Sequence, residues 1–291
     1  MRSLLSPLLL VFMTCTSLFA QMEDSILFKQ VDSTSLYMWV TYPADFDKTK
    51  SYPAIVFFFG GGWNGGSIGQ FEQHAFYFAG RGMICLRADY RVKQRQGTTP
   101  FESLKDAKSA IRYVRAHAKE LGVDPDKIVA SGGSAGGHLA AACAVIEGFN
   151  EEGEDRSVSC IPDALVLFNP VFDNGPGGYG FDRVGEAYKE FSPLHNLREG
   201  MPPAVVFLGT EDKLIPVETA RYFETVMEKV GSRCDLFLYE GEGHGFFNYR
   251  SYENYKDTRE KADEFLISTG LLQSLPDPEL KMGYPASKPS F

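Results

Sequence analysis

The sequence has few cysteines and, after its first twenty residues, no long apolar run. Five of its 291 residues are cysteine, and apart from Cys15 they lie far apart, at positions 85, 143, 160 and 234. A chain of this length buries a full core without disulfides, so we expect free thiols at these positions. The longest later apolar run, 139–146, has eight residues, whereas a membrane-spanning helix needs ~20.

Positive charge and metal-ligand spacing are scarce as well. The chain has 29 Lys and Arg against 38 Asp and Glu, a formal net charge of -9, and no large basic cluster. Nucleic acid is therefore not an expected partner. The five histidines form neither HExxH nor His-x-His, and no CxxC pair occurs, so we expect no metal and no cofactor. With 44% hydrophobic and 23% charged residues, the composition is that of an ordinary globular protein.

The first twenty residues have the pattern of a secretory signal peptide. Arg2 precedes an apolar stretch at 4–13, and small or polar residues continue to Ala20. A lipid anchor on Cys15 is a poor match to the residues before it. We therefore expect residues 1–20 to be removed after Ala20, which leaves a secreted or periplasmic protein without membrane contact.

The remaining chain alternates apolar runs with amphipathic ones. Two extended runs within 26–42 predict an antiparallel hairpin. Six short apolar runs are typical of strands buried on both faces of a parallel sheet: 52–59, 83–89, 127–130, 164–168, 204–208 and 235–239. Helical patterns occupy 70–81, 101–121, 135–146, 217–230 and 255–269. The alternation predicts one α/β domain, 21–273, with a doubly wound, mostly parallel sheet entered through the hairpin.

Three segments depart from this alternation. The charged connector 151–156 is most simply a solvated loop. The insertion 172–199 is rich in glycine and aromatic residues, and loops of that length within a domain are often functional. The tail 274–291 holds four prolines and no periodicity, so we expect it to wrap the surface or stay mobile.

The motif Gly-x-Ser-x-Gly, from Gly132 to Gly136, lies between the run 127–130 and the helical pattern that follows. At such a junction the chain makes a sharp, strained turn, which requires small neighbours and holds the hydroxyl clear of the sheet. The motif therefore predicts that Ser134 is a nucleophile.

A serine hydroxyl needs a base within hydrogen-bond reach and an acid that orients the base. Asp212 follows the run 204–208, and His244, flanked by glycines, follows 235–239. The carboxyl ends of such strands share one edge of the sheet, where ligands collect. The chain order Ser134, Asp212, His244 is that of α/β-hydrolases.

Two neighbouring residues offer alternatives for these roles. Glu211 adjoins Asp212 and cannot be separated from it by spacing alone. His138 lies four residues after Ser134, and we interpret it as a structural residue in the first turn of the helix. The remaining histidines carry no motif.

Glycines 60 to 62 and Trp63 follow the run 52–59. Amides without side chains can point at an oxyanion, so we predict a hole formed by the backbone N–H groups of Gly61, Gly62 and Ala135. Trp63 is expected to contact the substrate. The same glycines also fit a dinucleotide fingerprint, but residues 65–69 separate them from the next helix, where a pyrophosphate would have to bind.

With these motifs the chain resembles the α/β-hydrolase superfamily, in particular its acetyl-esterase/lipase group with hormone-sensitive-lipase-like and feruloyl-esterase-like members. The resemblance covers roughly 52–267. The matching positions are 60–63, 88–91, Asp106, 132–137, Asp212 and 243–246. One departure is Phe59, because the family's usual residue before the glycines is histidine, so other groups must brace the oxyanion loop. No long N-terminal cap helix is present, which favours an open cleft.

The resemblance implies a secreted serine carboxylic-ester hydrolase that removes acetyl or feruloyl groups from carbohydrate. Its partners would then be small-molecule or polysaccharide esters. Two other classes stay open. A peptidase of the prolyl-oligopeptidase kind shares the order of the three residues, although the chain has no room for a gating propeller. A non-catalytic carbohydrate-binding relative would share the fold.

Overall fold

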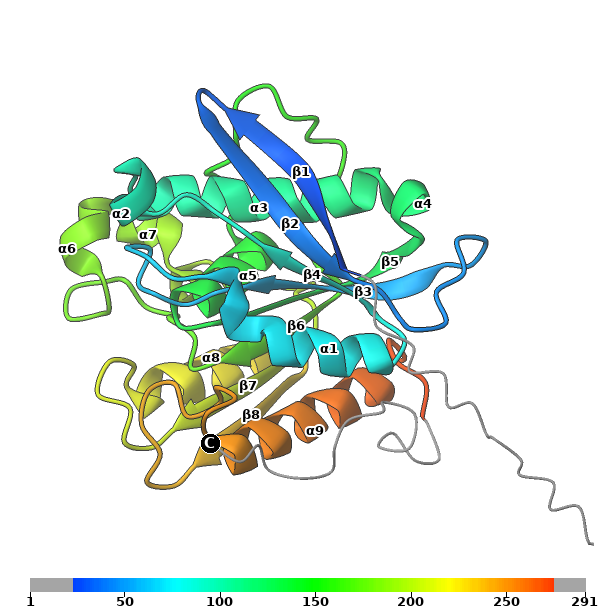
Figure 1. Ribbon diagram of the computed structural model, residues 1–291. Helices are drawn as coiled ribbons and strands as arrows, with labels where there is room; N and C mark the ends of the chain where they lie inside the picture. Colours follow the sequence, from blue (N-terminus) through cyan, green and yellow to red (C-terminus); the bar gives the residue numbers. More distant parts are fainter. Residues whose placement is uncertain (1–22, 275–291) are drawn as a thin grey trace, which may run out of the picture.

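One mixed sheet runs through the protein (Figure 1). The structure is a computed structural model and describes residues 23–274. The predicted signal peptide, 1–20, and the predicted tail beyond residue 274 lie outside the described residues. The strand order is β1-β2-β4-β3-β5-β6-β7-β8. The strands are β1 (Glu23–Val31), β2 (Thr34–Thr41), β3 (Tyr52–Phe58), β4 (Ile84–Ala88), β5 (Val123–Gly133), β6 (Ala164–Phe168), β7 (Ala204–Gly209) and β8 (Cys234–Tyr239).

The sheet is antiparallel at one edge and parallel elsewhere. β1 pairs with β2, and β2 with β4, in antiparallel fashion, while the strands from β4 to β8 pair in parallel. This confirms the predicted fold class, because each of the apolar runs forms one of the parallel strands. β5 begins earlier than predicted, since Val123 pairs with Tyr52 before a register shift.

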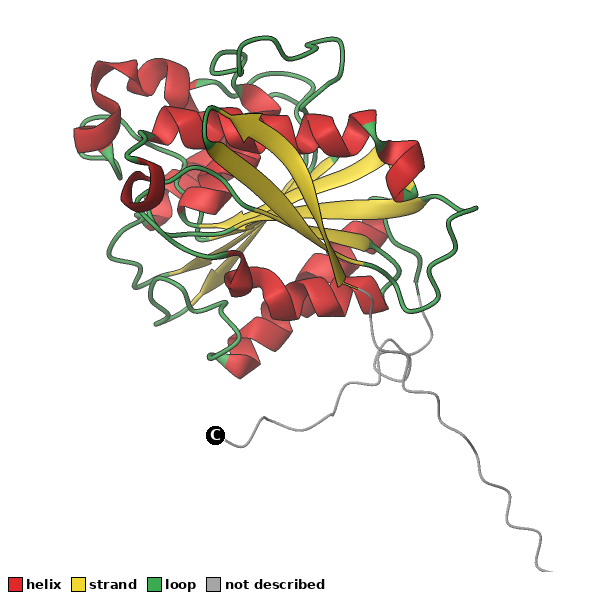
Figure 2. Cartoon of the chain, turned by 45° about the horizontal axis from the view of Figure 1, so that its top comes forward, coloured by secondary structure: helices red, strands yellow, loops and turns green. Residues whose placement is uncertain are grey.

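Helices cover both faces of the sheet (Figure 2). α3 (Pro100–Ala116), α5 (Ala135–Val145) and α8 (Val217–Lys229) share one core cluster with the sheet. α1 (Glu72–Gly80) and α9 (Tyr252–Ser268) share the cluster on the opposite face. The shorter elements are η1 (Ile68–Phe71), α2 (Lys93–Gln96), α4 (Ala118–Leu121), α6 (Phe181–Val184), η2 (Gly185–Ala187), α7 (Tyr188–Phe191) and η3 (Pro193–His195). Between residues 23 and 274, no helix is both long and apolar enough to cross a bilayer.

Local signals explain where α3 begins. The Thr99 side chain and Glu102 form a reciprocal capping box, and Pro100 occupies the first helical position, where a missing N–H costs nothing. The predicted helix 101–121 is divided in two, because α3 ends at Ala116 and α4 begins after His117.

The connector 151–156 is a loop in which residues 152, 153, 155 and 156 are exposed, as expected, but Glu151 is not simply solvated. Glu151 closes a buried network in which Lys29 and Arg91 each contact both Glu151 and Asp106, at 2.7 to 2.8 Å. Two cations and two carboxylates balance in charge, which such burial requires. The connector is therefore fixed to β1 and α3.

The insertion 172–199 is packed onto the domain. Phe172 stacks on Phe223 of α8, with ring centroids 3.9 Å apart. Phe191 lies against His138 of α5, at 4.4 Å. Because both contacts are buried, the insertion has a defined position at the carboxyl ends of the parallel strands.

The four cysteines of the described chain are free and buried. Burial raises the pKa of the Cys85, Cys143 and Cys234 thiols. Because the thiolate is the reactive form, these side chains behave as small apolar residues.

His74 of α1 is buried in an aromatic cage with no hydrogen-bond partner on either ring nitrogen among residues 23–274. Its ring lies 4.8 to 6.4 Å from those of Phe57, Phe71, Phe168, Phe247 and Tyr255. Burial, followed by the nearby charge of Arg259, lowers the pKa of His74 to about 3 from 6.5.

We predict that His74 makes the protein less stable as the pH falls. Its folded-state pKa lies below the ordinary value, so the unfolded chain binds more protons between pH 6.5 and about 3. Each unit by which the pH falls in this window lowers the free energy of unfolding by up to ~1.4 kcal/mol. The variant His74→Leu should flatten the slope of unfolding free energy against pH, measured by urea denaturation, by up to that amount. An unchanged slope would contradict the assignment, and His117→Leu, at the half-buried junction between α3 and α4, is the control.

Candidate active site

The turn between β5 and α5 holds Ser134 in a strained conformation, with φ 55° and ψ -119°. The glycines around it are required by close backbone contacts. A Cβ on Gly132 would collide with the carbonyl of Gly136, and a Cβ on Gly136 with that of Phe58 in β3. The motif therefore lets three backbone segments meet directly beneath the serine.

The structure brings Ser134, His244 and Asp212 into one hydrogen-bonded chain. His244 Nε2 lies 3.0 Å from Ser134 Oγ, and His244 Nδ1 lies 2.7 Å from Asp212 Oδ2. A carboxylate only accepts, so Nδ1 carries the proton that Asp212 accepts, and Nε2 is free to accept from the serine hydroxyl. The exposed Glu211 is not the partner of His244.

Asp212 is fixed from its other side. Its side chain has no exposed surface, and its Oδ1 accepts hydrogen bonds from the amides of Leu214 and Ile215 at 2.9 and 3.0 Å. Two donors on the same oxygen leave Oδ2 directed at His244. The imidazole itself is 24% exposed, so the site is open to ligands.

Asn169 belongs to this site and was missed from the sequence. It follows β6 directly, accepts a hydrogen bond from the Gly245 amide at 3.0 Å, and its Nδ2 lies 3.5 Å from His244 Nε2. Its backbone has a positive φ of 33°. The signal was present, because Asn169 ends a buried apolar run at the edge where Asp212 and His244 were expected.

The oxyanion loop, Gly60 to Gly62, runs beside the serine. A Cβ on Gly60 would lie 3.3 Å from that of Ser134. Within residues 23–274 the amides of Gly61 and Gly62 donate to no acceptor. Ala135 begins α5, where an amide has no partner within the helix and the helix dipole is positive. The oxyanion loop thus adjoins Ser134 at Gly60, and the hole formed by the amides of Gly61, Gly62 and Ala135 stays a prediction.

Gln70 and Tyr90 brace this loop where Phe59 replaces the expected histidine. Gln70 Oε1 accepts from the Gly60 amide at 2.6 Å. The Tyr90 hydroxyl donates to the Phe59 carbonyl at 2.6 Å, and the two rings stack at 4.1 Å. The histidine is thus replaced by a side-chain amide and a buried phenol.

A third brace comes from the insertion. Arg183 Nη1 of α6 donates to the Gly62 carbonyl. Its guanidinium lies 5.5 Å from the ring of Trp63 and 5.0 Å from that of Tyr179, and cation–π contacts of this kind hold the group in place. The position of the oxyanion loop therefore depends on a segment more than a hundred residues away.

Trp63 does not occupy the predicted position in the cleft. Only 1% of it is exposed, and its ring packs edge-on against His138 at 5.1 Å. His138 Nε2 donates to the Phe191 carbonyl oxygen at 3.0 Å, which fits the structural interpretation. The expectation that Trp63 contacts the substrate is therefore wrong, because its ring is buried against His138 and Phe191.

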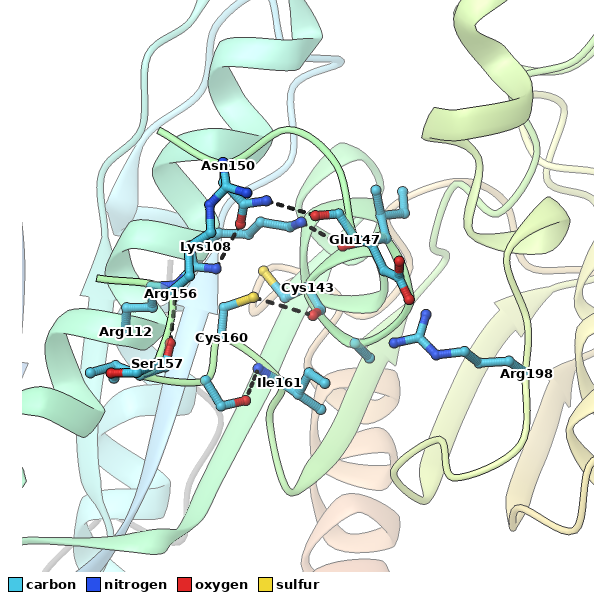
Figure 3. Close-up of a pocket in the computed structure, with 14 residues that line it drawn as sticks. Lys108, Arg112, Cys143, Glu147, Asn150, Arg156, Ser157, Cys160, Ile161 and Arg198 are labelled. Atoms are coloured by element: carbon cyan, nitrogen blue, oxygen red, sulfur yellow. Dashed lines mark hydrogen bonds between the residues drawn. The ribbon is translucent and has the colours of Figure 1, made fainter. Parts of the chain in front are cut away.

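A cavity of about 280 Å³ lies apart from these residues, between α3, α5 and the connector (Figure 3). Lys108 donates there to the carbonyls of Ile146 and Gly148. Arg112 is paired with Glu154. Lys108 and Arg112 of α3 therefore hold the carboxyl end of α5 and the connector in place. In the described part of the chain, no group of His, Cys, Asp or Glu is arranged to hold a metal.

This sheet topology, with serine, imidazole and carboxylate in line beside free amides, is that of a serine hydrolase of the α/β-hydrolase class. The BD-FAE family matches residues 40–163. Thermogutta terrifontis esterase 2, in a structure phosphoramylated by tabun, is 46% identical, with a TM-score of 0.84 over 87% of this chain and 97% of that one. The same esterase has been solved with propionate bound.

Two curated relatives are more distant. Esterase LipC of Mycobacterium tuberculosis is 30% identical over 220 residues, covering 68% of this chain and 54% of LipC. The acetylxylan esterase of Xylanibacter ruminicola is 26% identical over 192 residues, covering 61% and 37%. The chain thus spans about half or less of the length of these two proteins. It belongs to the α/β-hydrolase esterases, in the BD-FAE family.

We predict that Arg183 positions the oxyanion loop for the reaction. Replacing it in Arg183→Met removes the hydrogen bond to Gly62, and the oxyanion forms only in the transition state. The expected result is a kcat lower by about tenfold with little change in KM. Losing an oxyanion donor lowers kcat by ~10²-fold or more, and this variant keeps the donors but loosens the loop that carries them, so the loss should be smaller. Steady-state kinetics on a short-chain ester checks it. Lys189→Met, on the surface of α7, is the control, and a rise in KM alone would point to substrate binding instead.

Proposed function

We propose that this protein is an exported esterase that removes acetyl or feruloyl groups from carbohydrate, through an acyl-enzyme on Ser134. The observation that carries the proposal is the hydrogen-bonded chain from Ser134 to His244 to Asp212.

Acylation begins when Ser134 Oγ attacks the ester carbonyl carbon and its proton passes to His244 Nε2. The carbonyl oxygen becomes an oxyanion, which the amides of Gly61, Gly62 and Ala135 stabilise. Asp212 holds the imidazolium in orientation. When the carbon–oxygen bond to the alcohol breaks, His244 returns the proton to the leaving oxygen.

Deacylation repeats these steps with water. His244 Nε2 takes a proton from water as its oxygen attacks the acyl carbon, the same amides hold the second oxyanion, and the proton then returns to Ser134 Oγ as the acid leaves. No step needs a metal or an organic cofactor.

The substrate class rests on the comparisons and on the openness of the site. BD-FAE denotes bifunctional acetyl-xylan and feruloyl esterases, and one relative is an acetylxylan esterase. The relative from Thermogutta terrifontis binds propionate, which supports a site for short acyl groups. A partly exposed His244 leaves room for a bulky alcohol such as a sugar chain.

We predict that Ser134→Ala abolishes ester hydrolysis. Removing a triad nucleophile costs ~10⁶-fold in kcat in well-studied cases, and replacing the acid by its amide ~10⁴-fold. Both Ser134→Ala and Asp212→Asn should therefore lose activity on 4-nitrophenyl acetate, acetylated xylo-oligosaccharides and methyl ferulate. Glu211→Gln, beside Asp212, should retain it.

Paraoxon labelling gives an independent readout of the same assignment. Intact-mass spectrometry should show a single diethylphosphoryl adduct on the parent protein and none on Ser134→Ala. Equal turnover in parent and Ser134→Ala would overturn the mechanism, and turnover of simple esters without any sugar ester would overturn the carbohydrate substrate.

Export is part of the proposal and follows from residues 1–20. When the full chain is expressed in a bacterium with a secretory pathway, N-terminal sequencing of the mature protein should begin at Gln21. Replacing the apolar stretch 4–13 with polar residues should leave the protein in the cytoplasm. Retention of Met1 in the periplasmic or culture fraction would contradict a cleaved signal peptide.

A further inference from the structure

Two side-chain amides join the oxyanion loop to the loop that carries His244. The backbone amide of Gly60 donates to Gln70 Oε1 at 2.6 Å, and Gln70 Nε2 donates to Asn248 Oδ1 at 3.0 Å. Asn248 Nδ2 in turn donates to the carbonyl oxygen of Gly245 at 2.7 Å. Gln70 and Asn248 are 178 positions apart in the sequence, so this connection exists only in the folded protein.

A third side-chain amide, that of Asn169, continues the connection to the imidazole. Its Oδ1 accepts from the Gly245 amide at 3.0 Å, and its Nδ2 lies 3.5 Å from His244 Nε2. The residue before it, Phe168, accepts a hydrogen bond from the Ser134 amide through its carbonyl at 2.9 Å. The carboxyl end of β6 therefore holds the histidine loop through a side chain and the nucleophile through the backbone.

The groups at the two ends fix the orientation of the first two amides. The Gly60 amide only donates, so Gln70 presents its oxygen to Gly60 and its nitrogen to Asn248. The Gly245 carbonyl only accepts, so Asn248 presents its nitrogen there. Every hydrogen bond in the series thus donates toward the histidine loop, and hydrogen bonds aligned in this way polarise and strengthen one another.

Packed phenylalanine rings hold all three amides, because each amide has a buried phenylalanine next to it in the sequence. The pairs are Gln70 and Phe71, Phe168 and Asn169, and Phe247 and Asn248. The centroids of the three rings lie 4.7 to 5.8 Å from one another. A densely packed core keeps its side chains in single positions, so the rings fix the backbone from which the amides extend.

The connection joins two parts of the site that act in the same step. The substrate oxygen gains its negative charge while His244 Nε2 takes the proton of Ser134. Both the oxyanion donors and the base must then be in place, and groups positioned in advance stabilise this transition state most. Gly60 directly precedes two of the predicted donors, so a shift of Gly60 moves them relative to His244.

We propose that Gln70, Asn248 and Asn169 form an amide bridge that couples the position of the oxyanion loop to that of His244. All three are positioning residues, since none is the nucleophile, the base or a predicted oxyanion donor. The proposal rests on the proposed ester hydrolysis at Ser134 and adds to it a requirement for these side chains, whichever acyl group and alcohol the substrate carries.

The first test is a double-mutant cycle on two members of the amide bridge. Gln70→Met and Asn248→Leu keep the approximate shape of each side chain and remove its amide. Each should lower kcat on 4-nitrophenyl acetate about tenfold and leave KM within about twofold, because the coupled positions matter in the transition state. The double variant should stay within about threefold of the weaker single variant, since the first change already interrupts the bridge.

Tyr90→Phe is the matched control, because it removes a brace of the same loop that lies outside the amide bridge, the hydrogen bond to the Phe59 carbonyl. Tyr90 and Asn248 share no partner, so the losses of Tyr90→Phe and Asn248→Leu should multiply. Losses that multiply for Gln70→Met with Asn248→Leu overturn the bridge. Losses that multiply in neither pair, or single variants with unchanged kcat, overturn it as well.

The second test follows the imidazole directly by NMR, through the ¹⁵N chemical shift of His244 Nε2 in protein with labelled histidine. Gln70→Met alters a contact of the oxyanion loop, and the amide bridge carries this change to His244. We therefore expect the Nε2 resonance to move in Gln70→Met and to stay within its line width in Tyr90→Phe. An unmoved resonance in Gln70→Met, or an equal movement in both variants, overturns the bridge.

The two tests separate the amide bridge from the proposed function. A parent protein that hydrolyses 4-nitrophenyl acetate but no sugar ester overturns the carbohydrate substrate alone, and the double-mutant cycle still decides the bridge. A parent protein that hydrolyses no ester overturns the proposed function. The NMR comparison then decides whether the oxyanion loop and His244 are coupled, because it requires no turnover.

Discussion

The close approach of three backbone segments at Ser134 is the constraint on which the site depends. β3, the end of β5 and the start of α5 meet where only glycine fits, at Gly132 and Gly136. This contact fixes the strained serine, at a cost of ~1–3 kcal/mol for such a conformation, and sets the oxyanion loop beside it. The surrounding buried strands and helices offset the strain, so the nucleophile is held in place before any substrate binds.

The insertion 172–199 contacts the oxyanion loop through two side chains, Arg183 and Tyr179. Through Arg183 it holds the Gly62 carbonyl, and through Tyr179 it borders the space next to that loop. Its aromatic anchors, Phe172 and Phe191, pack on α8 and α5. A change in this insertion would therefore alter the position of the oxyanion loop, while the sheet stays the same.

Much of the fold and of the candidate active site was predictable from the sequence, because the signals lie within short segments. The parallel strands follow from continuous apolar runs, and Ser134 from glycine spacing at a strand–helix junction. Contacts between distant segments gave no such signal. The partners of Arg183 and Glu151 lie far away in the sequence, and Trp63 looks like a cleft residue until the insertion is placed over it. Asn169 could have been found by treating every strand end at the active edge alike.

The four cysteine thiols of the described chain lie in the core clusters on both faces of the sheet and are buried. In a compartment that oxidises thiols, a chain that folds slowly could form non-native disulfides. In the folded chain the buried thiols are shielded from this reaction. Speed of burial, rather than bridge formation, would then decide the yield of native enzyme.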